Sequence, residues 1–391
     1  MTDPIFVIAV LGANVAVAEW LARKTILRHL GAALLVIVVT AVTANVGLIP
    51  TVTGGSPVYD GVFTYVAPLA IFWLLLQVNL RSILKAGLPM VGLFVIGSLA
   101  TVAGVFVGMW AVDGAEAFGD VYRALGGMFV GTYTGGSANF NAIALEYHVV
   151  EDGALYAGAN VVDSAMTTLW MAASVALPRV LAGVWPAVRK SLAPHGAAGA
   201  TGELITGIED DTESVHPVDL AILLALGAFA VWASAHASEW LGAALGGRRV
   251  PSIIVLTTLA LVLAQLGPIQ RLTGTRLCGM FAVMIFLAVI GALCDISALL
   301  GMGTLGAKLA LFVTITVLVH GTLVYASAAL LRLDPAMAAV ASQANIGGGT
   351  SALALARSLG RPDLVLPAIL IGSLGTALGT YLGFLTVGWL P

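Results

Sequence analysis

The chain has 391 residues, of which 59% are hydrophobic and only 9% are charged. Soluble domains carry roughly 25% charged residues, so this composition excludes a large soluble domain and is typical of a protein that crosses a membrane many times. The net charge of −3, with no long basic cluster, gives no indication of nucleic-acid binding. We therefore expect a multi-pass protein whose main surroundings are a lipid bilayer.

Apolar runs of about 20 residues are long enough to cross the hydrocarbon core of a bilayer. No basic segment precedes the first run, so we expect it to be a mature span and not a cleaved signal. The longest polar segment, 185–216, predicts a flexible cytoplasmic linker between a first membrane repeat, 1–184, and a second, 217–391. The predicted spans are 5–22, 26–48, 62–79, 88–112, 154–178, 217–236, 251–267, 274–294, 304–330 and 363–388.

Two further stretches, 122–149 and 335–358, are broken by glycines, hydroxyls and amides. They contain Gly131-Thr-Tyr-Thr-Gly-Gly-Ser-Ala-Asn-Phe-Asn141 and Ser342-Gln-Ala-Asn-Ile-Gly-Gly-Gly-Thr-Ser351. Broken backbone at membrane depth is tolerated only where it is buried in protein or lines a wet cavity. One such break in each half predicts the binding site of a secondary transporter. The alternative is glycine that merely allows helices to cross closely.

The order of features repeats between the halves, and 67–77 resembles 278–288. If both broken stretches cross the membrane, ten of the 17 lysines and arginines lie on one side. If each stretch dips in and returns, 13 of them do, which fits the positive-inside rule better. The second arrangement gives five spans and one re-entrant hairpin per half, and hence two inverted repeats with both termini outside. A broken helix that crosses would support the same chemistry and stays open.

The polar residues of the two breaks are the candidate substrate ligands. Glycine lets the backbone turn and approach a ligand, and Ser137 or Asn139 suits the N-cap of a returning half-helix. The N-terminus of that half-helix would point its N–H groups at an anion. Each amide alone is as often a strut between helices. The candidates are Thr134, Gly135, Gly136, Ser137, Asn139 and Asn141, and Gln343, Asn345, Gly347, Gly348, Gly349, Thr350 and Ser351.

Asp163 lies about nine residues into its span, roughly 14 Å along the helix axis. An acid at that depth is costly and indicates function. Asn160 shares its helix face, so the two side chains are predicted to hold Na⁺, or Asp163 to carry a proton. The alternative is a hydrogen-bonded strut. Thr132 and Ser373 are further candidates for coupling to Na⁺ or H⁺, whereas a lone mid-span His320 predicts a packing residue.

The quoted breaks, together with 160–163 and 375–383, resemble the uncharacterised membrane family "domain of unknown function 819" over nearly the whole chain. That family is similar to the group of cation:proton antiporters and anion transporters that includes the bile-acid, glutamate and citrate sodium symporters. The resemblance implies inverted repeats, crossed or hairpin broken helices, a dimerising scaffold and a core that moves as an elevator.

Together these features predict an all-α polytopic protein of the inner cell membrane, forming a homodimer. We expect a Na⁺- or H⁺-coupled transporter of a small organic anion such as a carboxylate, amino acid or small peptide. The alternatives are a cation/proton antiporter without an organic substrate and an uncoupled, holin-like pore. No Walker, zinc-protease, dithiol or nucleophile-elbow motif occurs in the sequence. We therefore expect neither an enzyme nor a resident cofactor.

Overall fold

The computed structural model describes residues 3–25, 31–51, 56–181, 185, 215–245, 250–294 and 303–391. Regular secondary structure in these ranges is entirely helical, which confirms the predicted all-α class. Within the same ranges, 8 helices are long and apolar enough to cross a membrane. The predicted linker falls almost wholly outside the described residues.

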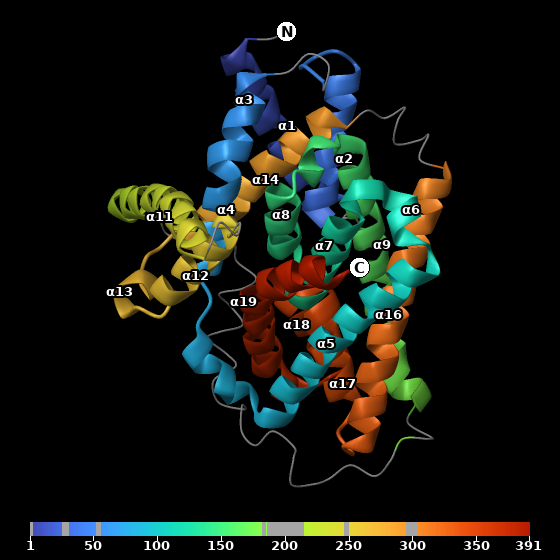
Figure 1. The fold of residues 1–391 in the computed structure, drawn as a ribbon. Coiled ribbons are helices and arrows are strands. Elements are labelled where there is room, and N and C mark those ends of the chain that lie inside the picture. The colour runs from blue at the N-terminus through green and yellow to red at the C-terminus, as the bar shows by residue number, and fades with distance from the viewer. Residues whose placement is uncertain are drawn as a thin grey trace.

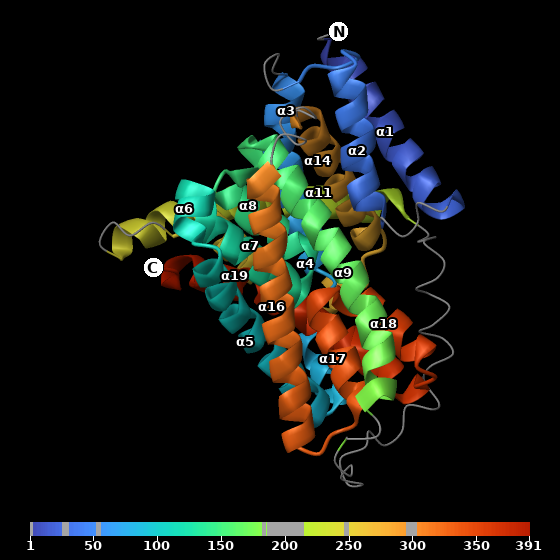
Figure 2. The same cartoon turned by 90° about the vertical axis from the view of Figure 1, so that its right-hand side faces the viewer.

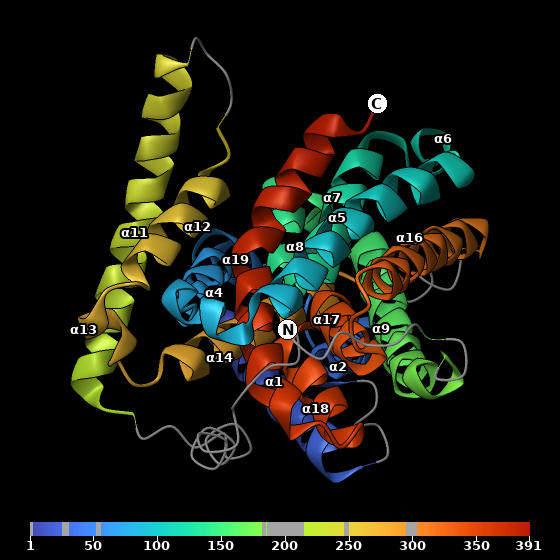
Figure 3. The same ribbon diagram turned by 90° about the horizontal axis from the view of Figure 1, so that it is seen from below.

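The helices pack into two bundles, which Figure 1 shows in chain colours. Figure 3 shows α11 along one edge of the molecule, beside α12 and α4. The peripheral bundle comprises α1 (Pro4–Lys24), α2 (Gly31–Asn45), α3 (Pro57–Gly61), α4 (Ala67–Leu75), α11 (Pro217–Ala244), α12 (Ser252–Leu263) and α14 (Thr275–Leu293). The core bundle comprises α5 (Leu88–Ala111), α7 (Tyr122–Gly135), α8 (Ser137–Glu146), α9 (Gly153–Leu181), α16 (Gly303–Leu330), α17 (Pro335–Ile346), α18 (Gly348–Ser358) and α19 (Val365–Trp389).

Most predicted spans agree with these helices to within a few residues, and three differ. The span predicted at 62–79 begins at Pro57 and contains a π-helical turn, Val62–Val66, before α4. The span predicted at 251–267 ends at Leu263, because Gly267 and Pro268 begin a separate short helix, α13 (Gly267–Gln270). The helix predicted at 217–236 continues to Ala244.

The first broken stretch is a helical hairpin. The ring centroids of Phe129 in α7 and Phe140 in α8 lie 5.7 Å apart, whereas a straight helix would separate these residues by roughly 16 Å. The turn occurs at Gly136, whose φ of +88° favours glycine. The helix α8 therefore folds back along α7.

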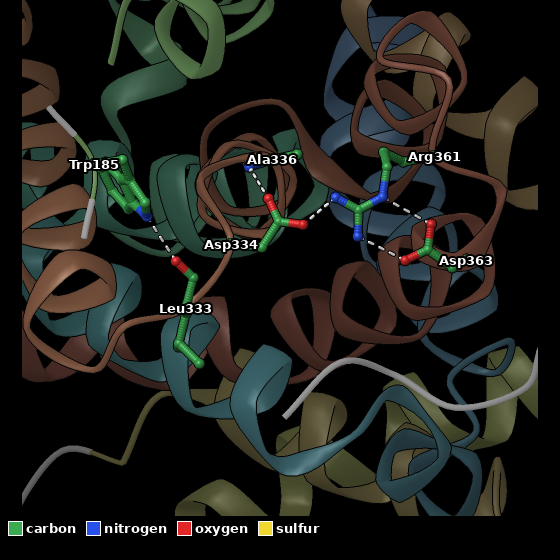
Figure 4. Close-up of polar contacts among 6 residues, drawn as sticks. All are labelled: Trp185, Leu333, Asp334, Ala336, Arg361 and Asp363. Carbon is green, nitrogen blue, oxygen red and sulfur yellow. Dashed lines mark hydrogen bonds and ion pairs between the residues drawn. The ribbon is translucent and has the colours of Figure 1, made fainter. Parts of the chain in front are cut away.

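The second broken stretch is also a hairpin, and its two ends are joined by charge (Figure 4). Asp334 caps α17 by accepting a hydrogen bond from the Ala336 backbone at 2.8 Å. Arg361, just after α18, pairs with the other carboxylate oxygen of Asp334. The guanidinium also contacts both carboxylate oxygens of Asp363, at 2.9 and 2.7 Å. Because the residues before α17 and after α18 touch, this stretch starts and ends at the same end of the core bundle.

One glycine-rich face of α19 holds both hairpins. A Cβ atom on Gly375 would lie 2.2 Å from the Thr134 carbonyl oxygen, and one on Gly372 would lie 2.3 Å from the Gly349 Cα atom. Further along the same face, Gly379 and Gly383 meet the first hairpin equally closely. Gly372 and Gly375 are less than one helical turn apart, roughly 4.5 Å along the axis. The two breaks therefore meet at nearly one point of α19.

The helices α5 and α16, each the third long helix of its half, run in opposite directions. In Figure 1, α5 climbs from the lower part of the molecule and α16 descends to the bottom. The two helices cross closely, since a Cβ atom on Gly104 would lie 2.5 Å from the Thr316 carbonyl oxygen. In Figure 2, α17 then starts at the lower end of α16 and packs beside α9.

We predict that Gly375→Ala strongly destabilises the protein, because the added methyl group would overlap the Thr134 carbonyl. Gly388→Ala is the matched control on the same helix, since its Cβ would have no neighbour within 4 Å. We expect a melting temperature lower by several degrees for Gly375→Ala and unchanged or slightly raised for Gly388→Ala. Equal melting temperatures would contradict the close contact between α19 and α7.

We predict that the residues flanking each hairpin lie on one side of the membrane. With Cys278 and Cys294 replaced by alanine, Asp120→Cys and Glu151→Cys should both react with an impermeant maleimide from outside intact cells. Leu331→Cys and Ser358→Cys should react only after permeabilisation. These four side chains are exposed. Labelling of Asp120→Cys and Glu151→Cys from opposite sides would mean that the first broken stretch crosses the membrane.

Candidate functional site

The two half-helices that leave the breaks lack side-chain caps. The N-cap of α8 is Gly136 and the N-cap of α18 is Gly347, and neither helix start receives a side-chain hydrogen bond. The prediction that Ser137 or Asn139 caps α8 is therefore wrong: Ser137 begins the helix and is exposed, and the Asn139 Oδ1 atom accepts from Thr380 at 2.6 Å. The first turns of these two helices therefore have no side-chain cap at the breaks, and uncapped N–H groups of this kind are suited to an anion.

The first break is distorted one turn before Gly136. Tyr133 has non-helical angles, φ −84° and ψ 17°, and its carbonyl accepts a hydrogen bond from Thr101 at 3.1 Å. The buried Thr134 hydroxyl has no partner. Asn141 accepts a hydrogen bond from the Tyr156 hydroxyl, which leaves its amide nitrogen unpaired.

At the second break, Gln343 is buried and donates to Ser351 at 3.0 Å, while its Oε1 atom has no partner. Gly347 packs closely against both of these side chains, and Gly348 has a φ of +77° with open space around it. Of the other candidates here, Gly349 lies against α19 and Thr350 is exposed.

Asn345 differs from the other amides because both of its polar atoms are used. Its nitrogen donates to the Phe94 carbonyl at 3.2 Å, and its oxygen accepts from Ser98 at 3.0 Å. These bonds fix α17 on α5. Asn345 therefore acts as a strut between helices, which was the alternative to substrate binding for each amide.

Unpaired buried polar atoms gather at the breaks. A buried polar atom without a hydrogen bond costs about 1–3 kcal/mol, so a cluster of them indicates a place where water or a ligand completes the bonding. Elsewhere in the described chain such atoms are dispersed, as at Thr40, Ser174, Thr257 and Tyr325. Those at the breaks are Tyr133 Oη, Thr134 Oγ1, Asn139 Nδ2, Asn141 Nδ2 and Gln343 Oε1.

Asp163 lies on α9, half-buried, beside the end of α7. Its Oδ1 atom is 3.5 Å from the Thr132 Oγ1 atom, and the Tyr133 hydroxyl also faces the carboxyl group. Asn160 instead donates to the Tyr156 carbonyl at 3.0 Å, and Ser373 donates to the Ile369 carbonyl at 3.2 Å. The structure thus brings Thr132 to Asp163 and adds Tyr133, whereas Asn160 and Ser373 make local contacts.

The sequence reasoning missed a buried network behind the second break. His320 lies 2.9 Å from Thr101 Oγ1 through Nδ1 and 2.9 Å from Ser342 Oγ through Nε2. Trp170 donates to the same Ser342 oxygen at 3.0 Å. Both ring nitrogens of His320 have hydrogen-bond partners, as expected for a packing residue, but one of these partners, Ser342, belongs to α17. Tyr133 lay inside the broken motif and could have been found, whereas Trp170 and Tyr156 look like ordinary apolar-helix residues.

Within the described residues, no group of three or more His, Cys, Asp or Glu side chains could hold a metal ion. The oxygen ligands available at the first break are one carboxylate, from Asp163, and neutral hydroxyl groups. That donor set suits a proton or a monovalent hard cation better than a divalent one, which usually takes several carboxylates.

The chain belongs to the family described as "Protein of unknown function (DUF819)", whose pattern matches residues 6–391. It is also similar to the "Uncharacterized membrane protein YjcL" of Bacillus subtilis (strain 168), with 29% identity over 358 residues. That alignment covers 89% of this chain and 87% of the relative. The match agrees with a multi-pass membrane protein.

Proposed function

We propose that this member of the DUF819 family is a secondary active transporter of a small organic anion, driven by Na⁺ or H⁺. The observation that carries the proposal is the meeting of two uncapped helix N-termini at one point of α19, among unpaired buried polar atoms. The proposal involves no enzymatic step and no resident cofactor.

The two helix ends favour an anionic substrate. Each N-terminus carries a partial positive charge and free N–H donors, and α8 and α18 direct two of them to the same region. The amide nitrogens of Asn139 and Asn141 add further unpaired donors. A carboxylate would use these donors, so the proposed class is a carboxylate, an amino acid or a small peptide.

The proposed coupling of ion and substrate follows from α7, which contributes to both sites. Asp163 contacts Thr132, and Thr132 lies about one turn before Gly136, where the proposed substrate site begins. A cation or proton at Asp163 would lower the electrostatic cost of an anion at the same break. Substrate and ion would therefore bind more tightly together than apart, which is the thermodynamic requirement for symport.

The arrangement of the bundles supports an elevator-type movement of inverted repeats. Helices α5 and α16 run in opposite directions, and both hairpins belong to the core bundle. Few contacts join the core bundle to the peripheral bundle, compared with the contacts inside each. We propose that the core bundle slides against the peripheral bundle, and that the exposed apolar face of α11 contributes to a homodimer in the inner cell membrane.

Uptake into proteoliposomes tests this function. Purified protein would be reconstituted with a panel of radiolabelled carboxylates, amino acids and small peptides, under an imposed Na⁺ or H⁺ gradient. Saturable, gradient-dependent uptake supports the proposal. Cation/proton exchange without any solute would favour the antiporter alternative, and unsaturable flux would favour a pore.

We predict that Gly136→Leu and Gly348→Leu abolish uptake while the protein still inserts. A Cβ atom would meet nothing within 4 Å at either position, so the effect comes from the positive φ and not from a clash. Gly47→Leu is the control, because Gly47 has φ +82° and equally open space but lies in the turn after α2. Normal uptake by both break variants would show that these two turns tolerate a side chain and do not shape the substrate site.

We predict that Asp163→Asn lowers ion-driven uptake at least tenfold, which corresponds to about 1.4 kcal/mol. The substitution keeps the shape of the side chain and removes its charge. Exchange of solute without a gradient should survive in part, since the two helix ends are unchanged. Asn160→Ala should be milder, because Asn160 donates within its own helix. Unaltered ion dependence in Asp163→Asn would make the acid a structural strut.

A further inference from the structure

We infer that the coupling ion is Na⁺ and that it binds between Asp163, Thr132 and Tyr133. The inference rests on the proposed function, and it names the ion and a ligand, Tyr133, that the sequence did not suggest. The site joins α9 to the last turn of α7, directly before the first break.

The distance between the two oxygens supports a cation. Thr132 Oγ1 and Asp163 Oδ1 lie 3.5 Å apart, whereas hydroxyl–carboxylate hydrogen bonds usually measure about 2.5–3.0 Å. Two oxygens that bind one hard cation at 2.3–2.6 Å, at right angles, are about 3.3–3.7 Å apart. The observed spacing is that of neighbouring ligands around an ion.

Tyr133 supplies the second, independent observation. Its side chain is fully buried, and its hydroxyl faces the Asp163 carboxyl group without reaching the geometry of a normal hydrogen bond to it or to any other group. Leaving a buried hydroxyl unpaired costs about 1–3 kcal/mol. The kink at Tyr133, held by the Thr101 bond to its carbonyl, fixes the residue in this place. An ion between the three oxygens would complete the bonding of the phenol.

The same geometry favours Na⁺ over H⁺ and over divalent ions. A protonated carboxyl group would donate best to an oxygen within about 3.0 Å, and the Thr132 oxygen lies 3.5 Å away. One carboxylate and two neutral hydroxyl oxygens carry a single negative charge, which matches a monovalent cation. Asp163 is only half-buried, so water can fill the remaining coordination positions.

Binding of the ion would also organise the substrate site. Thr132 accepts a backbone hydrogen bond from Gly136 at 2.8 Å, and Gly136 is the N-cap of α8. An ion held by Thr132 and Tyr133 would fix this kinked turn and hence the direction of the free N–H groups of α8. Substrate affinity would then depend on Na⁺ through geometry as well as through charge.

The test uses the purified full chain and needs no substrate. Thermal unfolding would be followed from 0 to 200 mM NaCl, with choline chloride holding the ionic strength constant and KCl as a comparison. We expect Na⁺ to raise the melting temperature saturably and K⁺ to have little effect. Asp163→Asn should abolish the response, and Thr132→Val and Tyr133→Phe should each weaken the apparent Na⁺ affinity at least tenfold.

Tyr133→Phe separates a ligand from a structural group. Because the hydroxyl is unpaired, the variant should melt in choline chloride at or above the temperature of the unmodified protein. The matched control is Tyr325→Phe, which also removes a buried, unpaired hydroxyl but on α16, and it should keep the full Na⁺ response. An unchanged Na⁺ response in Thr132→Val and Tyr133→Phe would overturn the inference.

Two outcomes separate this inference from the proposed function. Anion uptake that is driven by a proton gradient and is indifferent to Na⁺ would overturn the sodium site and leave the transporter standing. Saturable Na⁺ stabilisation that disappears in Tyr133→Phe, with no flux for any solute tested, would support the sodium site and overturn the symporter.

Discussion

The structure depends on close backbone contact between α19 and the two broken helices. At Gly372 and Gly375 the chains approach so closely that even a methyl group would not fit. A broken helix exposes backbone N–H and C=O groups that lipid cannot satisfy, so it must be enclosed by protein. The glycine face of α19 encloses both breaks at once, and for this reason their polar tips meet at one level of the core bundle.

The two hairpins are anchored by contacts away from their tips, and this anchoring allows the helix ends at the tips to stay uncapped. The ion pairs of Arg361 with Asp334 and Asp363 close the base of the second hairpin, and Asn345 fixes its first arm on α5. At the base of the first hairpin, Arg123 donates to the carbonyl of Pro391, just beyond the end of α19. Each hairpin is thus held at its base and along its length, so the tips can keep unpaired polar groups.

The sequence predicted the features that depend on local composition. Long apolar runs, two glycine breaks and one deep acid can be recognised without knowledge of tertiary contacts. In the structure the apolar runs are helices, the glycine breaks are turns, and the acid is the half-buried Asp163. Lysine and arginine counting favoured re-entrant stretches, but only the Asp334–Arg361 contact ties the ends of one together. Thr132 was a predicted coupling residue, but its contact with Asp163 and the lack of side-chain caps at the breaks could not be predicted, because they depend on how α9 and α19 pack against each break.

The buried network behind the breaks joins the proposed ion site to the second hairpin. The hydroxyl of Thr101 contacts both the Tyr133 carbonyl, at 3.1 Å, and His320 Nδ1, at 2.9 Å. On its other side, the His320 ring contacts Ser342 of α17. Hydrogen bonds therefore run without a gap from the kink of α7 to the first arm of the opposite hairpin. A shift of the kink at Tyr133 would change the hydrogen bonding of Thr101, and the imidazole would pass that change to Ser342.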